Sequence, residues 1–324
     1  MTSTSLSRRA CIAAALAVAA GALHAQPGYP DKPVRIVVPS SPGGSADAVA
    51  RLVADRLGRS LGQQFVVDNK GGGGGNIATE AVAKATPDGY TLLLTGNNHP
   101  VNVSLFPRAP YKLEDFAPII ELTRGPSVFV AAPNAPFSDL KGLIAAAKAS
   151  PNSVAFGSPG IGLPSHIAFE LFQYESKIQM VHAPYKGSGP SLADAMGGQI
   201  PVVASTLAAA MPHIKAGKLK PLAVTSPKRW PSLPEVPTVA EVLGTPFSHL
   251  TWLGVLAPRG TPEAVVVRLN AEMDKILKDP ELRKTLESMG TDPVGGSPAA
   301  MGKMIQDEYV AAKALIQAAR LKAE

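Results

Sequence analysis

The chain has 324 residues, of which 45% are hydrophobic and 17% are charged, and its net charge is +6 at pH 7. This length and composition exclude a disordered or fibrous chain and favour a globular protein of two domains with many short loops. The basic residues are scattered rather than grouped with aromatic residues, so no nucleic-acid partner is expected.

The first segment of the chain has the pattern of an export signal. Two arginines precede an apolar run from Ala10 to Leu23, and small residues at Ala22 and Ala25 offer cleavage sites. We therefore expect residues 1–25 to be a signal peptide, read by the general secretory or the twin-arginine route, and the mature protein to lie in the periplasm. No later stretch reaches the roughly 20 apolar residues of a membrane-spanning helix.

Cys11 is the only cysteine, and it lies within this signal. A mature chain without cysteine forms no disulfide and offers no thiol as a nucleophile or as a metal ligand. The histidines show no H-x-x-x-H spacing. We expect neither a metal nor a cofactor.

From residue 32 onwards, short β-branched runs alternate with helical patterns. Strands are expected at residues 34–38, 65–67 and 91–94, with helices at residues 46–59 and 76–84 between them. This βαβαβ order is typical of a mainly parallel sheet that is covered by helices on both faces.

A second series with the same architecture begins near Ser127. Three helices with a proline in the first turn come after it, and we expect Thr261, Asp279 and Ser297 to cap them. We place these helices back on the first domain, so that domain 1 comprises residues 26–124 plus 250–324 and domain 2 comprises residues 125–249. The second series is expected to contain strands at 127–130, 154–156, 180–182, 202–204 and 219–225, and helices at 140–149, 164–173, 191–196 and 207–216, with a later strand at 252–256.

Glycine and hydroxyl residues follow the first strand and open the next helix, between Pro39 and Asp47. The N–H groups at a helix start carry partial positive charge, and Gly43 and Gly44 would let an anion approach them closely. The alternative is a simple βα turn in which Ser45 or Asp47 caps the helix.

The loop from Gly157 to His166 repeats this pattern, and strand ends from two domains would converge at a cleft. Another glycine-rich loop, residues 70–76, lacks the GK[ST] ending of a P-loop, so nucleotide binding is not expected.

His166 with Ser158 or Ser165 would suit a serine hydrolase, but no G-x-S-x-G elbow or placed acid accompanies them. We interpret His166 as a structural or ligand-contacting residue and assign no catalytic residue.

Seven motifs along the mature chain resemble those of the receptors of tripartite tricarboxylate transporters, the Bug-type proteins. The resemblance implies a two-domain α/β periplasmic-binding-protein (Venus-flytrap) fold with a mainly parallel sheet in each domain. It also implies a monomeric receptor, not an enzyme, that binds a small organic carboxylate and delivers it to integral-membrane transporter subunits. The motifs are YPDKPVRIVVP at 29–39, PGGxxD at 42–47, GGNI at 74–77, PDGYTL at 87–92, DFAPI at 115–119, PYKGSGP at 184–190 and LPEVPT at 233–238.

The resemblance further implies where the ligand binds. Members of the family hold a carboxylate through backbone amides, hydroxyls and bridging waters rather than through an arginine. The corresponding positions here are Ser40, Ser41, Gly43, Gly44, Asp47, Thr95, Asn97, Asn98, Ser158, Gly160, Gly162, Ser165, His166, Lys186, Gly187, Ser188 and Ser205.

The sequence departs from the family pattern at several of these loops. Ser40 stands where phenylalanine is usual, Lys70 where arginine is usual, Leu163 where a small hydroxyl residue is common, and Ser205 where aspartate is frequent. The loss of that acid and that hydroxyl favours a plain carboxylate over a ligand with a cationic amine. A periplasmic serine hydrolase and a sensory receptor for a signalling kinase are the alternatives.

Overall fold

The computed structural model describes residues 28–318. The expected signal peptide, residues 1–25, lies outside them. The chain divides into two compact units, residues 1–31 and residues 32–324, and the second contains every helix and strand named below. Within the described range, no helix is both long enough and apolar enough to cross a membrane.

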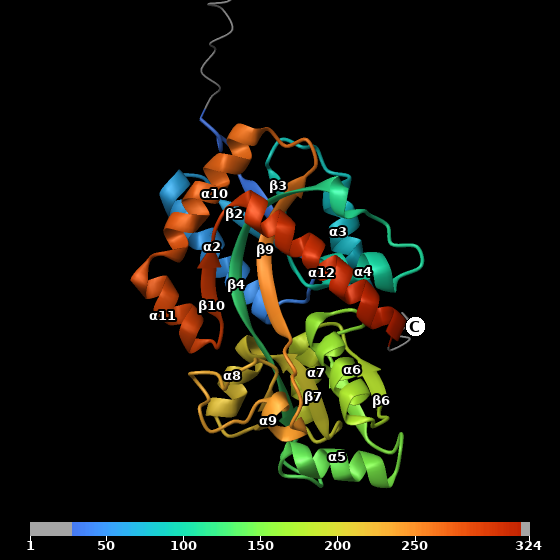
Figure 1. The fold of residues 1–324 in the computed structure, drawn as a ribbon. Helices are drawn as coiled ribbons and strands as arrows, with labels where there is room; N and C mark the ends of the chain where they lie inside the picture. The colour runs from blue at the N-terminus through green and yellow to red at the C-terminus, as the bar shows by residue number, and fades with distance from the viewer. Residues whose placement is uncertain (1–27, 319–324) are drawn as a thin grey trace, which may run out of the picture. The chain divides into compact units, whose positions relative to one another are not determined.

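The second unit consists of two lobes built on one sheet, as Figure 1 shows. The strands lie in the order β2-β1-β3-β9-β4-β7-β5-β6, and β8 and β10 also pair with β4. The strands are β1 (Val34–Val38), β2 (Phe65–Asn69), β3 (Thr91–Gly96), β4 (Phe116–Ala131), β5 (Ala155–Ser158), β6 (Val181–Pro184), β7 (Val202–Thr206), β8 (Lys220–Val224), β9 (Leu250–Pro258) and β10 (Asp292–Gly295).

A parallel triplet forms the outer part of the sheet in each lobe. In the first lobe β1 pairs in parallel with β2 and β3, and in the second β5 pairs in parallel with β6 and β7. These triplets come from the βαβ repeats of the sequence. The strands between the triplets are antiparallel: β9 runs against β3 and β4, and β4 runs against β7 and β8.

Strand β4 passes from one lobe into the other without a break. It pairs with β9 as far as Pro126, and from Ser127 it pairs with β7 and β8. The sequence predicted only its second half, residues 127–130. The first half contains Pro118 and Pro126, which have no N–H for a ladder and which hide the strand pattern. The lobes are therefore joined by a continuous strand rather than by a loop.

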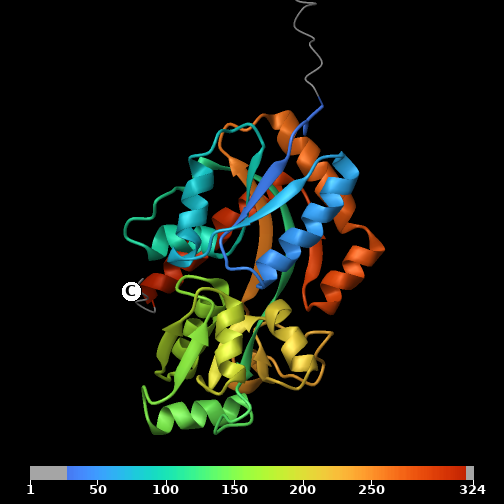
Figure 2. The ribbon, with the colours of Figure 1, turned by 180° about the vertical axis from the view of Figure 1, so that it is seen from behind.

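Helices cover both faces of the sheet in each lobe (Figures 1 and 2). In the first lobe α2 and α10 pack on one face and α3 and α12 on the other; in the second, α6 packs on one face and α7 and α8 on the other. The helices are α2 (Ser45–Leu61), α3 (Asn76–Ala83), α4 (Asn98–Leu105), α5 (Leu140–Ala149), α6 (Pro164–Ser176), α7 (Ser188–Met196), α8 (Leu207–Lys215), α9 (Val239–Leu243), α10 (Glu263–Leu277), α11 (Pro280–Ser288) and α12 (Pro298–Ala318).

Two of the three expected C-terminal caps are present. The Asp279 carboxylate accepts from the Leu282 N–H at 2.8 Å, and the Ser297 hydroxyl accepts from the Ala300 N–H at 3.2 Å. The prediction for Thr261 was wrong, because its hydroxyl donates to the Pro258 carbonyl at 2.8 Å and α10 begins only at Glu263. The Thr261 side chain therefore bonds the carbonyl at the end of β9 instead of an N–H group at the start of α10.

Four phenylalanines form the centre of the second lobe. Phe156 and Phe169 are stacked with ring centroids 4.1 Å apart, and Phe129 and Phe172 lie against Phe169 at 4.7 and 5.4 Å. All four are fully buried. They hold α6, which opens at the site described below, against the sheet.

Replacing Phe169 should destabilise this lobe. We expect Phe169→Ala to lower the free energy of unfolding by about 3–5 kcal/mol, because it removes a fully buried ring and leaves a cavity. Tyr174→Ala on the exposed side of the same helix should change it by about 0.5 kcal/mol or less. Chemical denaturation of both variants checks this, and equal losses would contradict the core assignment.

Candidate functional site

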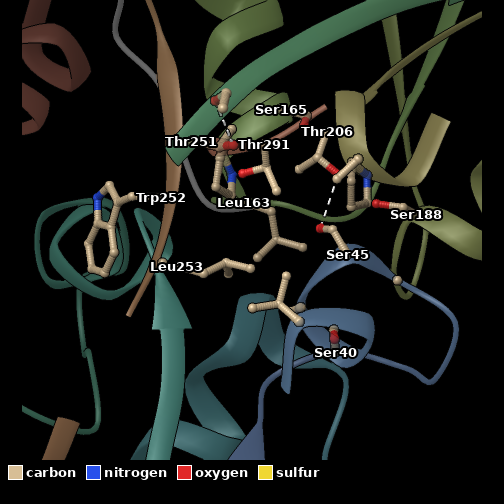
Figure 3. Close-up of a pocket in the computed structure, with 18 of the residues that line it drawn as sticks. Ser40, Ser45, Leu163, Ser165, Ser188, Thr206, Thr251, Trp252, Leu253 and Thr291 are labelled. Carbon is tan, nitrogen blue, oxygen red and sulfur yellow. Dashed lines mark hydrogen bonds between the residues drawn. The ribbon is translucent and has the colours of Figure 1, made fainter. Parts of the chain in front are cut away.

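A pocket lies between the two lobes, where the first turns of several helices meet β4 and β9 (Figure 3). None of its lining residues carries a charged side chain. The lining comes from residues 39–40, 44–46, 49, 95–96, 98, 123, 125–126, 159, 163–165, 187–188, 206, 208, 251–253 and 290–291.

The structure brings only part of the predicted set into this lining. A second chamber shares Pro39, Ser40, Pro159, Leu163 and Gly187 with the pocket and is bounded by the glycine-rich loop 72–75. Of the predicted residues, Ser40, Gly44, Thr95, Asn98, Ser165, Gly187 and Ser188 line the pocket; Gly160 and Lys186 line the second chamber; and Ser41, Gly43, Asp47, Asn97, Ser158, Gly162, His166 and Ser205 line neither.

Three helices open at the pocket without a side-chain cap. The cap positions of α2, α6 and α7 are Gly44, Leu163 and Gly187. None of these residues has a side-chain acceptor for the N–H groups of the helix. The first-turn N–H groups of these helices have no intrahelical partner and carry partial positive charge beside the pocket, although Pro164 in α6 and Pro190 in α7 have no N–H to contribute. An uncharged pocket bounded by such helix starts favours an anion.

Asp47 stabilises the loop before α2 without lining the pocket. Its carboxylate accepts from the Gly43 N–H at 3.0 Å and from the Arg51 guanidinium at 2.9 Å. Burial would by itself raise the pKa of Asp47, but the hydrogen bonds from Arg51 and Gly43 bring the pKa below its usual value. Asp47 therefore stays ionised and fixes the turn rather than facing the pocket.

Two polar groups in the lining have no partner among the described residues. The Ser40 hydroxyl and the Asn98 side-chain NH₂ are both buried without a hydrogen bond. Such groups are uncommon in folded proteins, because a buried donor without an acceptor costs free energy. Both groups can donate, so an acceptor such as a carboxylate oxygen would satisfy them.

Several hydroxyls of the lining are already engaged within the protein. Ser165 shares a hydrogen bond with the Ser127 hydroxyl at 3.0 Å, and Thr251 donates to the Gly125 carbonyl at 2.9 Å. Thr206 donates to the Ser45 hydroxyl at 3.1 Å, so this bond joins the two lobes directly. A second such bond runs from the Ser41 hydroxyl to the Lys186 carbonyl at 2.6 Å.

A pair of histidines supports the loop before α6. The rings of His166 and His182 are stacked 4.2 Å apart. His182 bonds the Ser158 hydroxyl at 2.7 Å, which in turn accepts from the Gly160 N–H, and His166 accepts from the Gly162 N–H at 3.3 Å. Ser158 and Ser165 are fully buried. This arrangement holds the loop, and His166 bonds neither Ser158 nor Ser165, the two serines considered for a hydrolase.

Asn97 has a similar role on the other lobe. Its side-chain oxygen accepts from the Trp252 N–H at 3.0 Å, and its NH₂ donates to the Leu250 carbonyl at 3.0 Å and to Glu308 of α12. Glu308 also accepts from the Trp252 indole. Asn97 therefore positions β9, whose residues Thr251 to Leu253 line the pocket.

Sequence reasoning missed the contributions of the strands and of the C-terminal segment. Thr123, Thr251 to Leu253, Gly290 and Thr291 reach the pocket only through long-range pairing of β4, β9 and β10. No local motif marks them. Thr206 could have been found, since it caps α8 by accepting from the Ala209 N–H.

The chain is similar to known proteins over most of its length. A family model described as "Tripartite tricarboxylate transporter family receptor" matches residues 49–321. The protein BugT of Bordetella pertussis is 39% identical over 86% of this chain and 87% of its own length.

Two solved structures that are similar to this chain are named with a carboxylate ligand. Rpa4515 of R. palustris with adipate is 35% identical, with a TM-score of 0.87 over 91% of this chain and 99% of that one. MatC from Rhodopseudomonas palustris with bound malate is 30% identical, with a TM-score of 0.85 over 89% of this chain and 100% of that one.

The histidine pair should make stability depend on pH. Burial lowers the pKa of His182 to about 4, and burial with the neighbouring His182 lowers that of His166 to about 3. Between these values and about 6.5 the unfolded chain binds more protons than the folded one, so stability falls as the pH falls through this window.

We expect each histidine to contribute about 2 kcal/mol to the loss of stability between pH 7 and pH 5. Replacing one of them, as in His182→Asn, should make the dependence on pH correspondingly less steep. Denaturant titrations at both pH values measure this, and an equally steep dependence in the variant would rule out the assignment.

Proposed function

The chain belongs to the family of tripartite tricarboxylate transporter receptors, and on this premise we propose that it captures a small organic carboxylate between its two lobes. The bound receptor delivers the carboxylate to the integral-membrane subunits of a transporter. The observation that carries this proposal is the uncharged pocket at which three uncapped helix starts converge. The adipate and malate of the two related structures support the ligand class.

Binding is coupled to closure of the lobes in this proposal. Domain 1 comprises residues 26–124 plus 250–324 and domain 2 residues 125–249, with β4 and the start of β9 as the hinge. The bonds between Ser41 and Lys186 and between Ser45 and Thr206 form across the rims of the cleft and support the closed state. A ligand that contacts both lobes stabilises this state because it binds the open state less tightly.

The family consists of periplasmic binding proteins, and we place this receptor there as a monomer. Residues 1–25 would direct export and be removed, by the general secretory or the twin-arginine route. The closed receptor would then present one continuous surface of both lobes to its membrane partner.

Closure should be visible in solution. Small-angle X-ray scattering should give a smaller radius of gyration when the ligand that co-purifies with the protein, identified by mass spectrometry, is added to stripped receptor. The melting temperature should rise with ligand concentration, since the ligand binds only the folded chain. An unchanged radius despite binding in a calorimeter would exclude the hinge mechanism.

Gly44→Val tests the helix start directly. Gly44 does not need a left-handed backbone, and the nearest atom to an added Cβ is the Ser41 carbonyl at 3.8 Å, so the variant should fold. Its side chain would occupy the approach to the α2 amides. We expect affinity for the co-purified ligand to fall about a hundredfold, as two charge-assisted hydrogen bonds are lost.

Gly197→Val is the matched control, because Gly197 also has no left-handed backbone, lies at the opposite end of α7 and does not line the pocket; the nearest atom to an added Cβ is the Ala193 carbonyl oxygen at 3.5 Å. This control should bind the co-purified ligand with an affinity within about twofold of the wild type, a smaller change than the loss of one hydrogen bond would cause. Calorimetry and thermal unfolding on the same samples measure both quantities. Unchanged affinity in folded Gly44→Val would remove the α2 start from the site.

A further inference from the structure

We propose that the ligand of this receptor is a monocarboxylate with an apolar body, and that Leu163 is the residue that sets this preference. The inference rests on the carboxylate-receptor function proposed above. It concerns the charge and the polarity of the ligand, which that function leaves open.

Two buried side-chain donors of the lining have no partner among the described residues. Asn98 is 3% exposed, and its NH₂ has no acceptor; the Ser40 hydroxyl has none either. Both belong to the first lobe, where the uncapped start of α2 at Gly44 adds free amides. These donors provide the position for one carboxylate.

The lining offers no cation to a second carboxylate. Within the described chain it contains no cationic side chain, so a second carboxylate would have to rely on neutral donors such as the starts of α6 and α7 and the hydroxyls of Ser188 and Thr291. Ser165, Thr206 and Thr251 use their hydroxyls within the protein. An additional buried carboxylate would lose its hydration without gaining a cation.

Apolar side chains separate the two ends of the pocket. In Figure 3, Leu163 and Leu253 lie between Ser40 and the hydroxyls of Ser165 and Thr251. The cavity measures about 90 Å³. A short apolar chain or a single ring would fill this volume and bury its surface against the leucines.

Leu163 also lies at the boundary between the pocket and the second chamber. It lines both the pocket and the second chamber, and the second chamber contains Lys186. Leu163 is the largest apolar side chain among the five residues that line both spaces, and a dicarboxylate would have to cross this boundary before its far end met the ammonium group. Leu163 therefore keeps the pocket apolar on the side where charge is available.

The test compares carboxylates that match in non-hydrogen atoms and differ in charge. The pairs are hexanoate with succinate and octanoate with adipate, titrated into stripped receptor by calorimetry. We expect the wild type to bind the monocarboxylate of each pair at least about tenfold more tightly, because only the dicarboxylate buries an unpaired charge.

Two variants of Leu163 locate the cause. Leu163→Lys introduces a cation and should move the preference towards the dicarboxylates by at least about tenfold. Leu163→Met keeps the volume and the polarity, so it should retain the wild-type preference. Thermal unfolding without ligand verifies that both variants fold.

The outcomes separate this inference from the receptor function. Dicarboxylates that bind wild type as tightly as their partners overturn the inference, and if Lys186→Met then removes their binding, the second chamber is the site of the second charge. A Leu163→Lys protein that folds and keeps the wild-type preference overturns the role of Leu163. If no probe binds, the inference fails, and the co-purified ligand decides the receptor function independently.

Discussion

An anion can be held in a pocket without a cation only if neutral donors already point at it before it arrives. Each helix start contributes a partial charge, and that contribution falls off within the first turn, so a small displacement of a loop loses it. The free energy of binding therefore depends on loops that do not move. The rest of the site can be understood from this one requirement.

Buried polar side chains outside the pocket hold two of these loops and the start of β9. Asp47 fixes the turn before α2, His166 and Ser158 fix the loop before α6, and Asn97 fixes the start of β9. These residues are among the predicted ligand-binding positions, yet they line neither the pocket nor the second chamber. Their importance for binding is that they orient the donors, which supporting hydrogen bonds do in many functional sites.

The local patterns of the sequence predicted the parallel triplets, helix α5 and the start of α6, because apolar periodicity and helix-initiating prolines act within a few residues. They did not predict α4, which is polar and begins with Asn98, or the first half of β4. They located the loops of the pocket but not the contributions of Thr123, Trp252 and Thr291. Those positions depend on pairing between strands far apart in the chain, which no local pattern records.

The path of the chain through β9 also fixes an order of assembly. Strands β1 to β3 are synthesised first, but β3 and the first half of β4 lie on either side of β9, which begins at residue 250. The sheet of the first lobe therefore cannot be completed until more than a hundred residues of the second lobe have been synthesised. Such long-range closure is slow to form. A nascent chain cut short before β9 would leave two strand edges open to aggregation, whereas most of the sheet of the second lobe could already be in place.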